Sequence, residues 1–282
     1  MKLELRDVTK RFGAKAALSH VDLIFEDGHI YGLLGRNGAG KSTLLNLAAG
    51  RLFPSGGGIF LDGEPVAENE RIAGKIFSMS EINYYPENLK VCQVFSALSG
   101  LYPEFDRGMA DALSKQFELD VLAKNSRLST GYGSILKLIC GLASNAPVLL
   151  LDEPVLGLDA NNRELFYRVL MENFSASPRL IIFSTHLIEE AAKLVDRAVI
   201  LKAGRVILTG ETEELCSSVY SVSGPAGAVD AYATGKTVLG TDTLGGLKTV
   251  YLREKPDGRP LPPGLEAGGV SLQKLFIELT NR

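Results

Sequence analysis

The sequence predicts an α/β fold in which a mostly parallel sheet is covered by helices on both faces. One observation favours this class, and a second indicates an additional antiparallel part. Apolar segments of strand length alternate with segments of helical periodicity, which is typical of parallel sheets with crossover helices. Near the N-terminus, residues 2–8 and 21–25 instead alternate apolar and polar side chains, as half-buried strands of an antiparallel sheet do. We therefore expect an antiparallel β subdomain beside the parallel sheet.

The N-terminal elements lead into a glycine-rich segment. Residues 10–15 form a turn between the two antiparallel strands, and this turn carries Phe12 and Gly13. A buried strand at 29–34 is followed by the glycine-rich segment 35–42 and by a helix at 41–49, which Gly50 ends.

The middle of the chain predicts a helical subdomain at about 82–143, followed by further strands and helices. Within the subdomain, helices are expected at 89–99 and 106–118 and from near Gly133. The later elements alternate along the chain: strand 148–151, helix 160–174, strand 180–183, helix 187–195, and strands 197–202 and 205–209.

The composition changes after residue 216, where Ser, Gly, Pro and Thr become more frequent. Short strand candidates surround a possible helix at 225–232, and residues 271–279 have the apolar spacing of an amphipathic helix. We expect a first domain at 1–216 and a small C-terminal α+β accessory domain at 217–282. The motif series described below ends before this boundary, so the accessory domain is not expected to contribute to the main site.

Bulk composition narrows the function classes. The chain has 282 residues with 45% hydrophobic and 22% charged residues, and its formal net charge of -3 argues against nucleic acid as the main partner. No stretch approaches the roughly 18 to 20 apolar residues of a membrane-spanning helix, and the N-terminal segment lacks the apolar core of a signal peptide. Any membrane contact is therefore expected to run through a partner. Cys92, Cys140 and Cys216 have no metal-binding spacing and are read as reduced packing residues.

Residues 35–42, GRNGAGKS, match the phosphate-binding loop G-x-x-x-x-G-K-[ST] completely, between a predicted strand and a predicted helix. Glycines allow successive backbone N–H groups to converge on a phosphate, and the start of the following helix adds its positive dipole. Lys41 is placed to reach the β- and γ-phosphates, and the Ser42 hydroxyl to bind Mg²⁺. A chance glycine-rich turn would not be expected between these two elements. The predicted nucleotide contacts in this segment are Gly35, Asn37, Gly38, Ala39, Gly40, Lys41, Ser42 and Thr43.

Two carboxylates, Asp152 and Glu153, follow the apolar strand at 148–151. Burying such residues costs desolvation energy, so packing alone does not explain them. With a phosphate-binding loop present, Asp152 is expected to contact Mg²⁺ or its water, and Glu153 to polarise the attacking water as a general base. A strand end that simply reaches solvent is the alternative.

Further motifs follow in the order found in ABC-family nucleotide-binding subunits, and the chain resembles that family over about residues 1–215. Residues 128–132, LSTGY, resemble the signature LSGGQ; residues 156–159, LGLD, resemble the D-loop; and Ser184-Thr185-His186 resembles the switch segment. The resemblance implies that His186 lies beside the γ-phosphate, and that Phe12 stacks on adenine. It also implies a P-loop NTPase core, ATP hydrolysis, and ATP and Mg²⁺ as ligands.

The family arrangement also implies shared sites. A signature serine and glycine at a helix start offer hydrogen-bond donors to an anion, and in the family this anion is the γ-phosphate bound by a second subunit. Ser129 and Gly131 are thus expected to complete the ATP site of another ABC subunit, which is either a copy of this chain or a relative.

Three positions depart from the family pattern. Glu81 stands where the family has glutamine; its carboxylate can ligate Mg²⁺ but adds a charge near the phosphates. The signature has Thr130 and Tyr132 in place of glycine and glutamine, while Ser129 and Gly131 are kept. Phe12 replaces a common tyrosine and still offers a stacking face.

The resemblance favours the motor subunit of a membrane exporter for a drug, peptide or similar cargo, held at the inner face of the plasma membrane by integral permease subunits. Residues 101–106 and 271–276 are similar to bacterial exporter cassettes. One alternative is a soluble ABC ATPase acting on DNA or ribosomes. Only 88 positions separate Lys41 from Ser129, which leaves no room for the long coiled coils of the chromosome-associated members. The other alternative is a regulatory module that binds ATP without turnover, against which the presence of Glu153 and His186 speaks.

Overall fold

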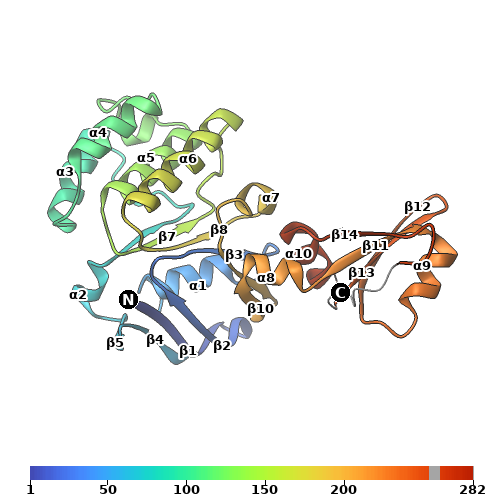
Figure 1. Ribbon diagram of the computed structural model, residues 1–282. Helices are drawn as coiled ribbons and strands as arrows, with labels where there is room; N and C mark the ends of the chain where they lie inside the picture. The colour runs from blue at the N-terminus through green and yellow to red at the C-terminus, as the bar shows by residue number, and fades with distance from the viewer. Residues whose placement is uncertain (254–260, 282) are drawn as a thin grey trace.

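The computed structural model describes residues 1–253 and 261–281, which form three β-sheets with helices around them (Figure 1). The first sheet is antiparallel, with strand order β2-β1-β4-β5. Its long hairpin pairs Leu3 with Phe25 and Leu5 with Leu23, so the alternating apolar residues share one buried face. The predicted antiparallel subdomain is confirmed. The strands are β1 Lys2–Phe12, β2 Lys15–Glu26, β4 Gly56–Leu61 and β5 Glu64–Pro65.

The second sheet has strand order β10-β9-β3-β8-β7-β6 and is parallel except for its edge strand β10, so the predicted mostly parallel sheet is confirmed. Its strands are β3 Ile30–Gly35, β6 Ile76–Met79, β7 Val148–Asp152, β8 Leu180–Ser184, β9 Arg197–Lys202 and β10 Arg205–Glu211. Strand β7 explains why the apolar run at 148–151 is continuous. Val148 and Leu150 join one buried cluster, while Leu149 and Leu151 join the other, because successive side chains point to opposite faces.

Helices cover both faces of the parallel sheet. Helix α1 and the antiparallel sheet pack on one face, and the helical layer drawn above the sheet in Figure 1 packs on the other. The helices of this part of the chain are α1 Lys41–Ala48, α2 Glu70–Ala73, α3 Val91–Leu101, α4 Arg107–Gln116, α5 Thr130–Ala143, α6 Ala160–Ala176, α7 Ile188–Ala191 and α8 Thr212–Ser217. The carboxyl ends of the parallel strands β3, β7 and β8 thus lie at the same edge of the sheet, where the candidate site lies.

Among the helices whose bounds differ from the sequence predictions, α5 and α7 differ most. Helix α5 begins at Thr130, three residues before the expected start, because the Ser129 hydroxyl accepts a hydrogen bond from the Tyr132 amide at 3.3 Å and caps the helix. Helix α7 is one turn long and ends at Ala191, where residues 187–195 were expected to be helical; residues 192–194 continue as turns.

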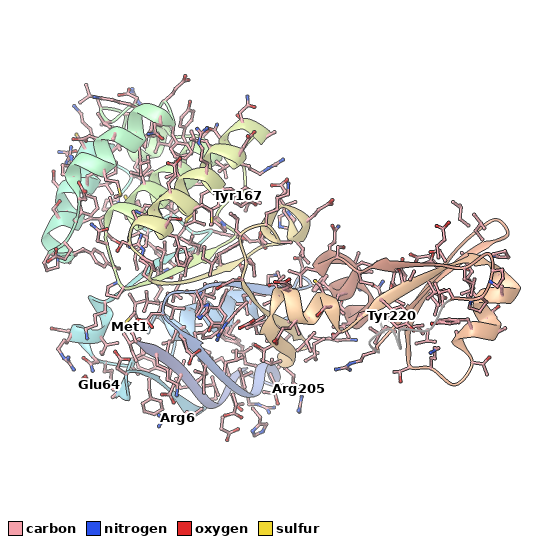
Figure 2. The ribbon with its side chains drawn as sticks, in the orientation of Figure 1. Met1, Arg6, Glu64, Tyr167, Arg205 and Tyr220 are labelled. Carbon is pink, nitrogen blue, oxygen red and sulfur yellow. The ribbon has the colours of Figure 1, made fainter. Side chains whose placement is uncertain are left out.

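The third sheet contains the strands after residue 219 and lies to one side of the other layers (Figures 1 and 2). Its strand order is β12-β13-β11-β14, and helix α9 packs on it. Tyr220, Val222, Val229, Val250 and Leu252 form a small buried cluster of its own. The elements are β11 Tyr220–Pro225, α9 Ala226–Ala233, β12 Val238–Leu244, β13 Leu247–Leu252 and β14 Glu266–Gly269, followed by α10 Leu272–Thr280.

Helix α10 returns to the nucleotide-loop side of the molecule. Its buried residues Leu272 and Leu275 belong to the large cluster on the parallel sheet, not to the cluster of the third sheet. The Arg36 guanidinium, in the glycine-rich loop, donates a hydrogen bond to the Asn281 side chain at 3.3 Å. A domain boundary near 217 therefore stays a proposal for the third sheet, while α10 packs with the first part of the chain.

The three cysteines are free thiols. Cys140 is fully buried on α5, and burial raises its pKa to about 12. A thiol with so high a pKa is a poor nucleophile, as expected of a packing residue.

Candidate functional site

The glycine-rich loop joins the carboxyl end of β3 to the start of α1. The ammonium of Lys41 donates a hydrogen bond to the Gly35 carbonyl at 2.7 Å, which closes the loop across its two ends. Gly40 has φ of +109°, and a Cβ atom there would lie 2.7 Å from the Ala17 carbonyl oxygen, so only glycine fits. The loop's free N–H groups and the α1 N-terminus together form a site for an anion.

A pocket opens directly over this loop and brings together residues from four separate segments. They come from the β1–β2 hairpin, the loop with the start of α1, the segment after β6, and the residue after β7. The lining residues are Phe12, Lys15, Ala17, Asn37, Gly38, Ala39, Gly40, Lys41, Ser42, Thr43, Glu81 and Glu153. Ten of the sequence-predicted residues therefore share one cavity.

Phe12 stands at one end of the pocket with half of its surface (51%) exposed. The Lys10 ammonium lies over the Phe12 ring, 5.1 Å from its centre, in a cation–π contact. An exposed ring on a pocket wall can stack on a planar heterocycle. This is the geometry that the predicted adenine contact requires.

Lys15 and Ala17 also line the pocket, and the sequence did not predict them. They enter because β1 and β2 form a hairpin, in which Phe12 pairs with Lys15. Lys15 adds a second cation to a pocket that already contains Lys41. A basic residue three positions after the aromatic was the only sequence signal.

The two carboxylates at the end of β7 face different environments, although both are buried, with exposures of 4% for Asp152 and 8% for Glu153. Asp152 pairs with Ser184 on neighbouring strand β8, and the Ser184 hydroxyl donates to Asp152 Oδ1 at 2.6 Å. The backbone amide of Glu153 donates to the same hydroxyl oxygen at 3.1 Å. Ser184 thus fixes the end of β7 from the next strand.

Glu153 is directed toward the pocket and toward His186. The imidazole Nδ1 lies 2.8 Å from Glu153 Oε2, and the backbone amide of His186 donates to the same oxygen at 3.4 Å. Glu153 also has a left-handed φ of 47°, an uncommon backbone conformation for a glutamate that is often found at functional positions. The structure therefore places two of the three predicted catalytic side chains in direct contact, the third being Lys41.

The oxygen donors at the pocket fit Mg²⁺. Ser42 and Glu81 lie on the pocket wall, and Asp152 lies beneath it on β7, beside Glu153. Across residues 1–253 and 261–281 no group of three or more His, Cys, Asp or Glu residues could hold a metal alone. A site with few carboxylates suits Mg²⁺, which takes much of its coordination from water and substrate phosphates.

The signature residues Ser129 and Gly131 lie outside this pocket, at the start of α5. Ser129 is exposed, and Gly131 packs on the D-loop of its own chain: a Cβ atom on Gly131 would lie 2.6 Å from the Gly157 carbonyl oxygen. The Ser134 hydroxyl donates to the Leu156 carbonyl at 3.0 Å and holds the same two segments together. The start of α5 is therefore a second, separate set of donors.

Comparisons with known proteins find a family and several relatives that are similar to this chain. The family described as ABC transporter matches residues 18–156. The ABC transporter ATP-binding protein YtrB of Bacillus subtilis (strain 168) is 30% identical over 213 residues, which cover 76% of this chain and 73% of that protein. The Nod factor export ATP-binding protein I of Burkholderia orbicola (strain AU 1054) is 33% identical over 234 residues, covering 79% of this chain and 77% of that protein.

Two solved structures are similar to the same part of the chain. An ATP-binding subunit of an ABC transporter is 25% identical with a TM-score of 0.69, covering 76% of this chain and 92% of its own. A dimeric ATP-binding cassette in a post-hydrolysis state, bound to ADP and Pi, is 24% identical with a TM-score of 0.67, covering 74% of this chain and 98% of its own; this likeness concerns the fold.

Proposed function

We propose that this chain, which belongs to the ABC transporter family of ATP-binding proteins, drives an exporter in the membrane. The chain is an ATPase and the ATP-binding motor subunit of a transporter. The finer proposal is that its cargo, a drug, a peptide or a similar molecule, leaves the cell. The observation that carries the ATPase mechanism is the pocket that the phosphate loop, Glu81 and Glu153 line together, with His186 in contact with Glu153.

We assign ATP binding to the loop and to the aromatic turn. The backbone N–H groups of residues 37, 38 and 40–42 and the Lys41 ammonium bind the phosphates, and Phe12 stacks on the adenine ring. Ser42, Asp152 and Glu81 would hold Mg²⁺, which neutralises charge on the phosphate oxygens when bound. The pocket thus fixes the nucleotide at both of its ends.

Hydrolysis is assigned to Glu153 and His186. Glu153 orients and polarises a water molecule for attack on the γ-phosphate, and such a positioned base contributes about 10² to 10⁴ in rate. His186 holds the Glu153 carboxylate through the 2.8 Å contact at Nδ1, which leaves its Nε2 atom for the γ-phosphate. Donation to the carboxylate from Nδ1 and to the γ-phosphate from Nε2 requires a proton on each ring nitrogen.

The second donor set supports a shared site. Ser129 and Gly131 lie away from the chain's own pocket, at an exposed helix start. In a head-to-tail dimer they would reach the γ-phosphate bound by the other subunit, which is a copy of this chain or a related one. ATP would then close the dimer and hydrolysis would release it.

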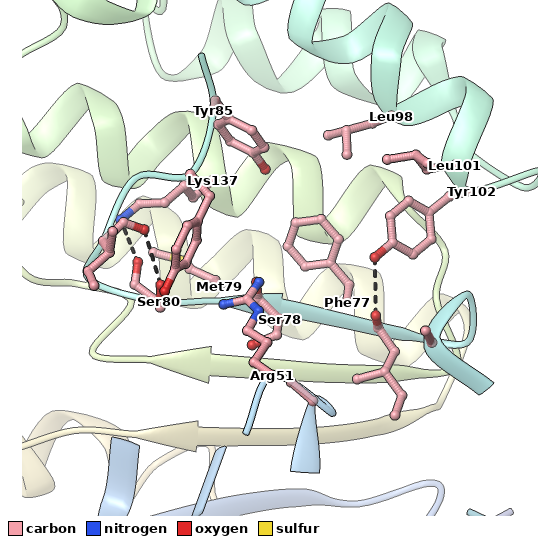
Figure 3. A pocket seen from close by; sticks show the side chains of 15 residues that line it. Arg51, Phe77, Ser78, Met79, Ser80, Tyr85, Leu98, Leu101, Tyr102 and Lys137 are labelled. Carbon is pink, nitrogen blue, oxygen red and sulfur yellow. Dashed lines mark hydrogen bonds between the residues drawn. The ribbon is translucent and has the colours of Figure 1, made fainter. Parts of the chain in front are cut away.

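A second cavity supports a membrane permease as partner. It lies between the parallel sheet and the helical layer, and Figure 3 shows apolar and aromatic side chains along it. Ile82, Tyr84 and Leu101 line this groove and are exposed by 63%, 59% and 68%. No helix in the described part of the chain is long and apolar enough to cross a membrane. We propose that a cytoplasmic segment of the permease occupies the groove and holds the chain at the inner membrane face.

Export is supported by a relative whose name states that it acts in Nod factor export. An ABC ATPase acting on DNA or ribosomes and a non-hydrolysing regulatory module are the alternatives. We assign neither. The first alternative would leave the exposed apolar groove without a partner, and the second would leave the Glu153–His186 pair without a function.

The test compares two leucines of similar exposure. Leu101 lines the groove, whereas Leu122 is 64% exposed on the same helical layer and does not line it. Leu101→Asp should release the tagged chain from the membrane fraction of its native host and abolish co-purification of the permease, and Leu122→Asp should do neither. ATP hydrolysis by the isolated Leu101→Asp chain should remain. A chain that never associates with a membrane protein would contradict the transport assignment.

A further inference from the structure

A buried lysine on the signature helix contacts the segment that carries Glu81. Lys137 lies on α5, and its exposure is only 7%. Its ammonium donates a hydrogen bond to the Ser80 carbonyl at 2.6 Å (Figure 3). It donates another to the Glu81 carbonyl at 3.0 Å. These bonds join the helix that Ser129 caps to the first residues after strand β6.

Burying the Lys137 ammonium costs desolvation free energy, which its hydrogen bonds must offset. An ammonium removed from water must be paired, and burial lowers the pKa of Lys137, while the negative charges of Glu81 and Asp152 oppose that shift. Hydrogen bonds from a charged donor are stronger than neutral ones and are directional. Two such bonds to adjacent carbonyls fix the backbone on both sides of the Ser80–Glu81 peptide.

Lys137 also lies between the groove and the nucleotide pocket. It lines the groove together with Ser80, whereas the Glu81 side chain lines the nucleotide pocket. A second cation holds the same segment from the other side, because the Arg51 guanidinium donates to the Ser78 carbonyl at 2.6 Å. The segment at 78–81 is thus attached to the residues that follow α1 by Arg51 and to α5 by Lys137.

We propose that Lys137 is a positioning residue that holds Glu81 in the nucleotide pocket for its contact with Mg²⁺. The inference rests on the proposed role of Glu81 as a metal ligand and adds to it the group that orients this ligand. Residues that orient metal ligands typically change metal affinity by about 10- to 100-fold when they are replaced. Because Lys137 is on the signature helix, movement of that helix would change the position of Glu81 directly.

The experiment measures how much Mg²⁺ improves ATP affinity. Calorimetric titration of the full chain with ATP, once with Mg²⁺ and once with EDTA, gives this gain as the ratio of two dissociation constants. Glu81→Ala removes the proposed ligand, and Lys137→Met keeps the aliphatic stem but removes the ammonium. Each change should reduce the gain by about 10-fold or more. The double variant should lose no more than Glu81→Ala alone, since Lys137 acts through Glu81.

Two further variants separate positioning from general destabilisation. Arg179 is also 7% exposed and donates to the carbonyls of Ala146 and Leu142, away from both cavities. Arg179→Met should lower thermal stability without changing the Mg²⁺-dependent gain, and Lys137→Arg, which retains a cation and its donors, should keep more of the gain than Lys137→Met. Equal gains in the wild type and Lys137→Met, or additive losses in the double variant, would overturn the inference.

The outcomes also distinguish the inference from the function on which it rests. If Glu81→Ala lowers the gain and Lys137→Met does not, only the role of Lys137 fails. If Glu81→Ala leaves the gain unchanged, the assignment of Glu81 as a ligand fails, and the inference with it. A wild-type chain that binds no ATP with Mg²⁺ would refute the proposed nucleotide site itself.

Discussion

The Nδ1 atom of His186 lies 2.8 Å from Oε2 of Glu153, although 33 residues separate them in the chain. The contact exists because β7 and β8 are neighbours in the parallel sheet, where Asp152 pairs with Ser184. Each strand ends with a polar segment at the same edge, so the carboxylate after β7 meets the imidazole after β8. The backbone amide of His186 donates to the same carboxylate oxygen and restricts it further.

This relationship predicts the effect of Glu153→Gln. The amide keeps the shape of the side chain but cannot act as a base, so ATP binding should persist while turnover falls by about 10²- to 10⁴-fold. Phosphate release measures the turnover, and size-exclusion chromatography with ATP should show an accumulated dimer. Glu172→Gln, an exposed change on α6, is the matched control and should retain activity. Near wild-type hydrolysis by Glu153→Gln would mean that another group is the base.

Lys41→Ala should abolish tight ATP binding. The ammonium is the only lysine or arginine charge within the loop that also lines the pocket, and charge-assisted contacts to phosphate are among the strongest hydrogen bonds in proteins. Direct titration with ATP checks this, with Lys115→Ala on the exposed side of α4 as the control. Unchanged affinity in the Lys41 variant would remove the assignment of this loop.

The sequence predicted most of the site because each motif stands at the end of a parallel strand. The glycine-rich loop after β3, the carboxylates after β7 and His186 after β8 needed only the sheet order to come together. Contacts across the hairpin were not predictable in this way. Lys15 reaches the pocket because of its pairing opposite Phe12, and its only sequence signal is its place three positions after that aromatic residue.

Lys137 and α10 show two further limits of sequence reasoning. Lys137 is a single charge within an apolar helix, and its partners are backbone carbonyls, which leave no signal in side-chain types. The apolar spacing of residues 271–279 predicted α10 correctly but could not say which core it joins. That choice depends on where the chain returns after β14, which is a property of the tertiary fold.

The packing of α10 predicts unequal effects for two leucines of the C-terminal region. Leu275 is 2% exposed within the large cluster on the parallel sheet, so Leu275→Ala should destabilise that part of the protein by about 2 to 5 kcal/mol. Leu244, at the end of β12, is 84% exposed, and Leu244→Ala should change stability by less than about 0.5 kcal/mol. Urea unfolding measures both, and equal effects would contradict the placement of α10.

The separation of Ser129 from the pocket allows the shared site to be tested with mixed dimers. Let one subunit carry Lys41→Ala and the other Ser129→Arg. If Ser129 completes the ATP site of the opposite subunit, both changes fall on the same composite site and the second site stays intact. If each chain uses its own signature, both sites are damaged.

Binding stoichiometry decides between these arrangements better than turnover does, because coupled sites can both be required for a catalytic cycle. Calorimetry on purified mixed dimers should find one intact ATP site per dimer, while each variant homodimer should show defects at two. The single-chain geometry favours this result: Ser129 is exposed at the start of α5, and neither Ser129 nor Gly131 lines the pocket that contains Lys41. A mixed dimer without an intact site would mean that the signature acts within its own chain or has no part in ATP binding.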